Sequence, residues 1–305
     1  MNKTVSLSTS ERLDQLRNTG ASKVGLGVLL TLLTALLMSF VAAAIKYISP
    51  IVSIEMIISV QYLVCIVSML PWLFKVGLSG LKTNQFKLHL LRALTGWFCL
   101  YFYFLAIKHI PLVDAVLLRN AAPLCVPIWV LLWLKVRIPM LRWLPVIVGL
   151  FGIVLILNPA VEGLKLWHMV GFMSAFMMAG SIVSTRVLTV TEPASQIMFY
   201  YFLLSCLFSF PMALSSNMHV PLEALPFMIV IGLFMLFSMW CYTRAYKFAS
   251  ATIISPISYF SVVFTGILSW FFWDQVPTTL AIVGALLVVI GGIGSVLFGQ
   301  PKSTG

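Results

Sequence analysis

The feature that most constrains this chain is a succession of long apolar segments separated by short charged connections. A transmembrane helix needs about 20 mainly apolar residues to cross a hydrocarbon core about 30 Å thick. Ten such segments can be marked along the 305 residues, at 24–45, 51–74, 91–108, 112–134, 142–158, 166–187, 194–214, 224–246, 251–273 and 279–298. The sequence therefore predicts an all-α, polytopic membrane protein with ten transmembrane helices and polar ends at 1–23 and 299–305.

Composition excludes a water-soluble globule. Hydrophobic residues make up 61% of the chain and charged residues only 9%, whereas soluble domains are about half apolar. A cleaved signal peptide is an alternative for the first apolar segment, which follows basic residues. That segment is longer than the roughly 7–15 apolar residues of a signal peptide, so we expect it to be retained as a span.

The basic residues indicate how the chain is oriented. The formal net charge is +11, but lysines and arginines gather at alternate connections, as expected when basic loops stay in the cytoplasm. A cytoplasmic N-terminus places fifteen of the nineteen on the inner side: Lys3, Arg12, Arg17, Lys23, Lys75, Lys82, Lys87, Arg92, Lys135, Arg137, Arg142, Arg186, Arg244, Lys247 and Lys302. We therefore expect both termini in the cytoplasm, and we interpret the basic loops as topology signals rather than as nucleic-acid patches.

Motifs for enzyme or motor chemistry are missing from the sequence. The five cysteines all fall within predicted spans, where they are expected to act as small packing residues. There is no His-Glu-x-x-His motif and no phosphate-binding G-x-x-x-x-G-K-[ST] loop. We expect no cofactor and no metal, and an intramembrane enzyme is a weaker hypothesis because no nucleophile with its base and no acid pair is evident.

The two halves of the chain resemble each other weakly. AIKHIPLVDAV from Ala106 aligns without gaps on AYKFASATIIS from Ala245, a shift of 139 residues that also pairs Gly152 with Gly291. The shift superimposes spans three to five on spans eight to ten. Because each half would hold five spans, the second half must enter the membrane from the opposite side, which predicts inverted five-helix repeats over 24–158 and 166–298.

A repeated pattern resembles the drug/metabolite transporter superfamily, of the ten-span EamA type. It consists of a proline-bearing span, an acidic residue, another proline and a glycine-punctuated span, as in SPISYFSVVFTGILSWFFWDQVPTTLAIVGALLVVIGG from Ser255 to Gly292. The first half has APLCVPIWVLLWLKVRIP, in which Lys135 stands where the family usually has a glutamate. The resemblance implies a central cavity lined by spans three, four, eight and nine, with spans five and ten as supports.

Arg119 is the most informative polar residue within a predicted span. It lies eight residues beyond Pro111, which is about 12 Å along a helix, and an arginine at such depth usually faces a cavity or a partner. A side chain that reaches the interface and a structural ion pair are the alternatives. Asp114 is a poor partner because it lies five positions before Arg119, which puts the two side chains about 140° apart around the helix. Asn120 and Asp114 join Arg119 as candidate substrate-binding residues.

The remaining candidates are one acid and several aromatic residues. Glu55 could pair with Arg119 or Lys108, bind a proton, or lie exposed at the interface. Aromatic side chains usually gather at membrane interfaces, but four of them lie where they could stack on a substrate in the cavity: Trp97, Tyr101, Trp240 and Tyr259.

The sequence therefore favours a secondary transporter that moves a small polar metabolite, such as an amino acid or related organic compound, across the inner membrane by alternating access. RALTGWF near Arg92 and RNAAP near Arg119 resemble family members that take up S-adenosylmethionine, which is the alternative substrate. A passive channel is an alternative of another class. The expected partners are the metabolite and membrane lipid, and the sequence leaves a homodimer open.

Overall fold

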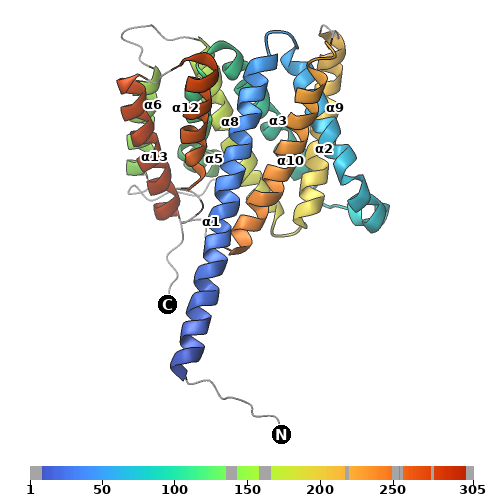
Figure 1. The fold of residues 1–305 in the computed structure, drawn as a ribbon. Coiled ribbons are helices and arrows are strands. Elements are labelled where there is room, and N and C mark those ends of the chain that lie inside the picture. Colours follow the sequence, from blue (N-terminus) through green and yellow to red (C-terminus); the bar gives the residue numbers. More distant parts are fainter. Residues whose placement is uncertain are drawn as a thin grey trace.

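The described part of the chain forms a bundle of helices (Figure 1). A computed structural model describes residues 9–134, 143–157, 166–216, 220–248, 254, 257–275 and 278–299. These residues contain no strand, which confirms the all-helical prediction. The helices are α1 Thr9–Ile48, α2 Ile54–Val76, the short 3-10 helix η1 Leu78–Leu81, α3 Phe86–His109, α4 Leu112–Asn120, α5 Ala122–Leu134, α6 Trp143–Leu157, α8 Leu166–Leu188, α9 Ala194–Ser215, α10 Leu225–Phe248, α12 Phe260–Trp273 and α13 Thr279–Gly299.

Length and composition make the chain a multi-pass membrane protein. Seven segments of the described residues are long and apolar enough to cross a membrane: Val24–Ile48, Ile54–Val76, Phe86–His109, Leu112–Trp133, Leu166–Leu188, Ala194–Ser215 and Leu225–Ala245. Three further apolar helices are shorter: Trp143–Leu155, Phe260–Trp273 and Thr279–Gly294. The bounds of all ten lie within about five residues of the predicted spans, except that the ninth starts later because much of 249–256 lies outside the described residues.

The first span is continuous with the segment before it. The helix begins at Thr9 and runs without a break to Ile48, and its first part projects beyond the other helices (Figure 1). From Thr9 onward, the polar segment predicted over 1–23 is therefore the N-terminal part of α1 and not a separate element.

The fourth span is broken in the middle. Its first part, α4, ends at Asn120, and α5 begins at Ala122. The amide of Ala121 turns back to the carbonyl oxygen of Leu118, at 3.1 Å. Pro123 explains the position of the break, because it has no amide hydrogen to donate to the carbonyl of Arg119 four residues earlier. Arg119 and Asn120 therefore lie at a helix end inside the bundle.

Helices from the two halves of the chain pack against each other. In the bundle α3 lies against α8 and α9, α1 against α10 and α12, and α2 against α9 and α10. At one edge α6 packs on α13, and α2 and α9 form the opposite edge (Figure 1). A Cβ built on Gly152 of α6 would lie 2.6 Å from the carbonyl oxygen of Gly284 on α13. Glycine is needed there because the two helix backbones touch.

Candidate functional site

Arg119 lies in the interior at the broken fourth span. Its guanidinium carbon is 4.7 Å from the ring centroid of Tyr103 on α3, a side chain that is 2% exposed. Its Nε is buried and has no hydrogen-bond partner among the described residues. The positive charge therefore lies against an aromatic face. This contact stabilises the charge but does not neutralise it.

A second arginine lies in the same interior. Arg92 is six residues into α3, about 9 Å from the start of the helix. Its guanidinium carbon is 4.1 Å from the ring centroid of Tyr201 on α9, and its Nη1 donates to the hydroxyl of Ser181 on α8. Its Nε is also buried without a partner in the described part of the chain. We interpreted Arg92 from the sequence as a cytoplasmic topology charge; the structure instead places it against α8 and α9.

Buried tyrosines connect the two arginines. The hydroxyls of Tyr62 on α2 and Tyr201 on α9 are 2.8 Å apart, and the two rings meet edge to face. Tyr201 and Cys99 are each electrostatic neighbours of both Arg92 and Arg119. The result is an arginine–tyrosine cluster, which we define as Tyr62, Arg92, Tyr103, Arg119 and Tyr201.

Asn120 belongs to a neighbouring polar group between α4 and α12. Its amide nitrogen donates to the hydroxyl of Ser261 at 3.0 Å, and the Tyr259 hydroxyl donates to its backbone oxygen at 3.4 Å. Ser39 on α1 extends this group by donating to the carbonyl oxygen of Ser261 at 3.0 Å. The broken helix thus exposes a backbone acceptor that the ninth span uses.

Trp97, Tyr101 and Glu55 form a third group. The rings of Trp97 and Tyr101 are stacked, with centroids 5.3 Å apart and planes 7° apart. The Tyr101 hydroxyl donates to Oε1 of Glu55 at 3.0 Å, so this acid contacts α3 rather than pairing with an arginine or lysine. Trp97 is 5% exposed, and its Nε1 has no partner among the described residues.

Asp114 and Trp240 lie apart from these groups. Oδ2 of Asp114 is 3.8 Å from Nε2 of His168 on α8, so the carboxylate lies beside a histidine and not beside Arg119. Trp240 is 44% exposed on α10, stacks on Phe237 and lies under the guanidinium of Arg244. The structure therefore brings together Asn120 and Tyr259, and separately Trp97, Tyr101 and Glu55, whereas Arg119 lies in the arginine–tyrosine cluster.

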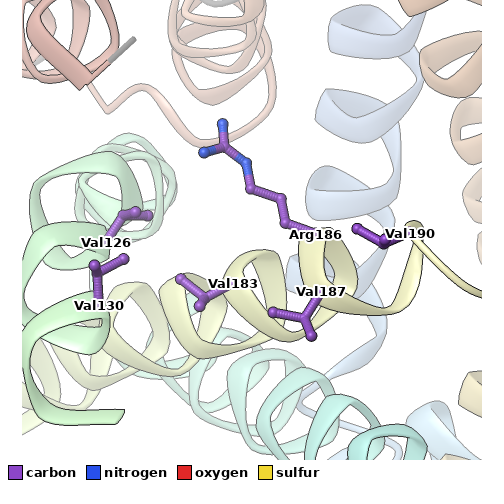
Figure 2. A pocket seen from close by; sticks show the side chains of 6 residues that line it. All are labelled: Val126, Val130, Val183, Arg186, Val187 and Val190. Carbon is purple, nitrogen blue, oxygen red and sulfur yellow. The ribbon is translucent and has the colours of Figure 1, made fainter. Parts of the chain in front are cut away.

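An apolar groove lies outside the arginine–tyrosine cluster (Figure 2). It measures about 320 Å³ and lies between α5 and α8, where valines line it together with Arg186, whose side chain extends away from them (Figure 2). With one charged group on an apolar wall, the groove lacks the converging polar groups expected of a metabolite site.

Arg119 is the one member of the cluster that the sequence predicts as a site residue. Arg92 was assigned to the membrane surface because it stands near the start of a span. Tyr62 and Tyr201 were not singled out at all. A signal was present, because these two tyrosines are 139 residues apart, the shift that relates the two halves of the sequence.

Charged and polar side chains held inside a bundle of apolar helices are typical of a polytopic membrane protein with a functional site in its interior. The model of the EamA-like transporter family matches the chain twice, over residues 25–158 and 165–297. The chain therefore belongs to the EamA-like transporter family, within the drug/metabolite transporter superfamily.

Curated relatives carry several different names. The chain is 33% identical over 207 residues to the pseudopaline exporter CntI of Pseudomonas aeruginosa, covering 67% of this chain and 72% of the relative. It is 26% identical over 235 residues to a riboflavin transporter of Vibrio cholerae, covering 76% and 78%. It is 23% identical over 235 residues to an S-adenosylmethionine uptake transporter of Rickettsia prowazekii, covering 77% and 80%.

A solved crystal structure has the same fold. It covers 92% of this chain and 99% of its own, with a TM-score of 0.58 at 19% sequence identity.

Proposed function

We propose that this protein is a secondary transporter that moves a small polar metabolite with an anionic group across the inner membrane by alternating access. The observation that carries the proposal is the position of Arg119, a charged side chain in the interior without an ion pair among the described residues. An arginine binds a carboxylate or phosphate through two parallel hydrogen bonds. We expect Asn120, in the neighbouring polar group, and the tyrosines to hydrogen-bond the rest of the substrate.

The proposal includes ten spans arranged as two inverted five-helix repeats, 24–158 and 166–298. The double match of the family model supports two repeats. Two hydrogen-bonded pairs also support them: Tyr62 with Tyr201, and Asn120 with Tyr259, are each 139 residues apart. In a two-fold arrangement, residues near the axis contact their own equivalents.

Contacts between α6 and α13 give independent support. A Cβ on Gly152 would lie 2.9 Å from the amide nitrogen of Val288, and a Cβ on Gly291 would lie 2.6 Å from Gly149. Under the shift of 139 residues, position 288 corresponds to 149 and position 291 corresponds to 152. Both contacts therefore join the same two repeat positions, with the roles of the two halves reversed. Such reciprocity is expected of a self-complementary, two-fold interface.

The substrate we favour is an amino acid or related organic compound. The curated relatives are named for different small organic molecules, which is consistent with a shared scaffold whose specificity depends on side chains at the site. S-adenosylmethionine stays the alternative, supported by the named relative and by the carboxylate that Arg119 could hold.

Counterflow with a whole metabolite extract tests the proposal. Purified protein in sealed liposomes is preloaded with an unlabelled extract of polar cell metabolites, and a ¹³C-labelled extract is added outside without ATP. A carrier should accumulate a labelled compound faster in preloaded than in empty liposomes, which mass spectrometry can identify. Equal uptake in both would indicate a channel, and uptake that needs ATP would contradict a secondary transporter.

A further inference from the structure

The interior holds two arginines in matching surroundings. Arg92 lies on the face of Tyr201 at 4.1 Å, and Arg119 lies on the face of Tyr103 at 4.7 Å. Each has a buried Nε without a hydrogen-bond partner in the part of the chain described. Cys99, on the same helix as Arg92 and Tyr103, is an electrostatic neighbour of both arginines.

The described acids do not neutralise this pair. The chain has eight acidic residues; the side chains of Glu11, Asp14 and Glu162 lie outside those described. Of the other five, Glu55 accepts from Tyr101, Asp114 lies beside His168, Glu192 accepts from Thr83, and Glu223 and Asp274 are exposed in connections between helices.

We propose that Arg92 is a second anion-binding residue and that the site takes an organic compound with two anionic groups, such as a dicarboxylate. This inference rests on the proposed function, in which Arg119 holds the first anion. Two cations near each other in the interior repel and lose hydration, so a ligand that brings one negative charge to each is favoured over one that brings a single charge. The tyrosine faces hold both planar guanidinium groups in place, each with hydrogen-bonding atoms to spare.

The surroundings of Arg92 show how the chain makes room for it. A Cβ built on Gly96, one helical turn further along α3, would lie 2.5 Å from Nη1 of Arg92 and 2.6 Å from Cε2 of Tyr201. Glycine at 96 therefore lets the guanidinium lie flat between α3 and α9. A purely structural role for Arg92, joining α3 to Ser181 on α8, is the competing explanation.

Matched anions separate the two explanations. The full-length protein in detergent is titrated with unbranched dicarboxylates from malonate to suberate and with the monocarboxylate of the same carbon number, at constant ionic strength, while its thermal midpoint is followed. At one chain length, the dicarboxylate should reach half of its maximal stabilisation at a concentration about tenfold lower or more than the monocarboxylate, because a charge-assisted hydrogen-bonded pair is added.

Variants assign that preference to the two arginines. Arg92→Gln should bring the dicarboxylate-to-monocarboxylate ratio close to one while monocarboxylate binding persists at Arg119. Gly96→Ala, which keeps the charge but displaces the guanidinium, should reduce the ratio in the same direction, and Arg92→Lys should restore part of it. Arg186→Gln removes an exposed arginine of α8 and should leave the ratio unchanged, which controls for general attraction of dianions.

Each outcome decides something. If wild-type protein shows no dicarboxylate preference but Arg119→Gln loses monocarboxylate binding, the second site is wrong and the Arg119 anchor stands. If Arg92→Gln lowers the unliganded thermal midpoint yet keeps the full preference, Arg92 is structural and the inference is overturned. If no anion of either kind stabilises the wild-type protein, the inference and the anionic substrate of the proposed function both fail.

Discussion

Arg119 shows how much free energy a charge inside a helix bundle costs a membrane protein. Placing an arginine at the centre of a span costs at least about 2.5 kcal/mol on insertion scales. The face of Tyr103, 4.7 Å away, offsets about 0.5–2 kcal/mol of that cost. The cost of insertion thus exceeds what the tyrosine contact returns, which is consistent with a side chain retained for a ligand rather than for stability.

Replacing Arg119 with leucine should abolish transport while leaving the amount of folded protein in the membrane nearly normal. The change removes an unpaired charge rather than a packing group, so the thermal midpoint should stay the same or rise. Arg119→Lys should keep a weakened fraction of transport, because lysine retains the charge but not the planar fork. The measurements are the counterflow rate per molecule of folded protein and the thermal midpoint in detergent. Full transport by the folded leucine variant would leave the arginine without a functional role.

The broken fourth span shows how an element creates a site. Without the break at Ala121, the carbonyl of Asn120 would lie within a continuous helix. The break leaves this oxygen available to the Tyr259 hydroxyl of α12. Discontinuous helices are found near the binding sites of secondary transporters for the same reason, because irregular backbone is tolerated only where other groups satisfy it.

Close packing of α6 on α13 leads to a prediction about stability. Gly152→Ala should lower the thermal stability by about 1–3 kcal/mol, the usual range for overpacking, because the new methyl group would meet the backbone of Gly284 at 2.6 Å. Gly266→Ala in α12 is the matched control, since nothing lies within 4 Å of a Cβ built there. Thermal midpoints of both variants in detergent would check this. Equal midpoints would mean that α6 and α13 do not approach so closely in the membrane.

At the scale of the whole molecule, the first and the last described helices have their outer ends on one side of the bundle. The start of α1 and the end of α13 lie toward the same end (Figure 1). An even number of membrane crossings would put both of these helix ends on the same side of the membrane. The distribution of basic residues predicts that this side is the cytoplasm.

Reporter fusions test this orientation. Reporters joined after Lys82 and after Gly299 should be active in the cytoplasm, whereas one after Pro221 should report the external side. A phosphatase and a fluorescent protein, which are active on opposite sides of the inner membrane, provide complementary readings at each position. Opposite locations for the Lys82 and Gly299 fusions would contradict ten spans.

Much of the fold could be predicted from the sequence because membrane insertion depends on local hydropathy. Any run of about 20 apolar residues favours a helix across the bilayer, whatever its neighbours are. The positions of the spans, their family resemblance and the depth of Arg119 follow from this local information. Pro123 and Pro127 in the fourth span likewise predict a bend there, because proline removes a backbone donor.

The contacts of the site were decided only by the tertiary structure. The spans are apolar on nearly all sides, because lipid tails are as apolar as a protein core, so no pattern of polar and apolar residues tells which face of a helix is turned inward. Packing between helices far apart in sequence sets that rotation. It turned Arg92 toward Tyr201 and joined Tyr62 to Tyr201 across 139 residues. It also gave Glu55 the neighbour Tyr101 instead of Arg119, and Asp114 the neighbour His168.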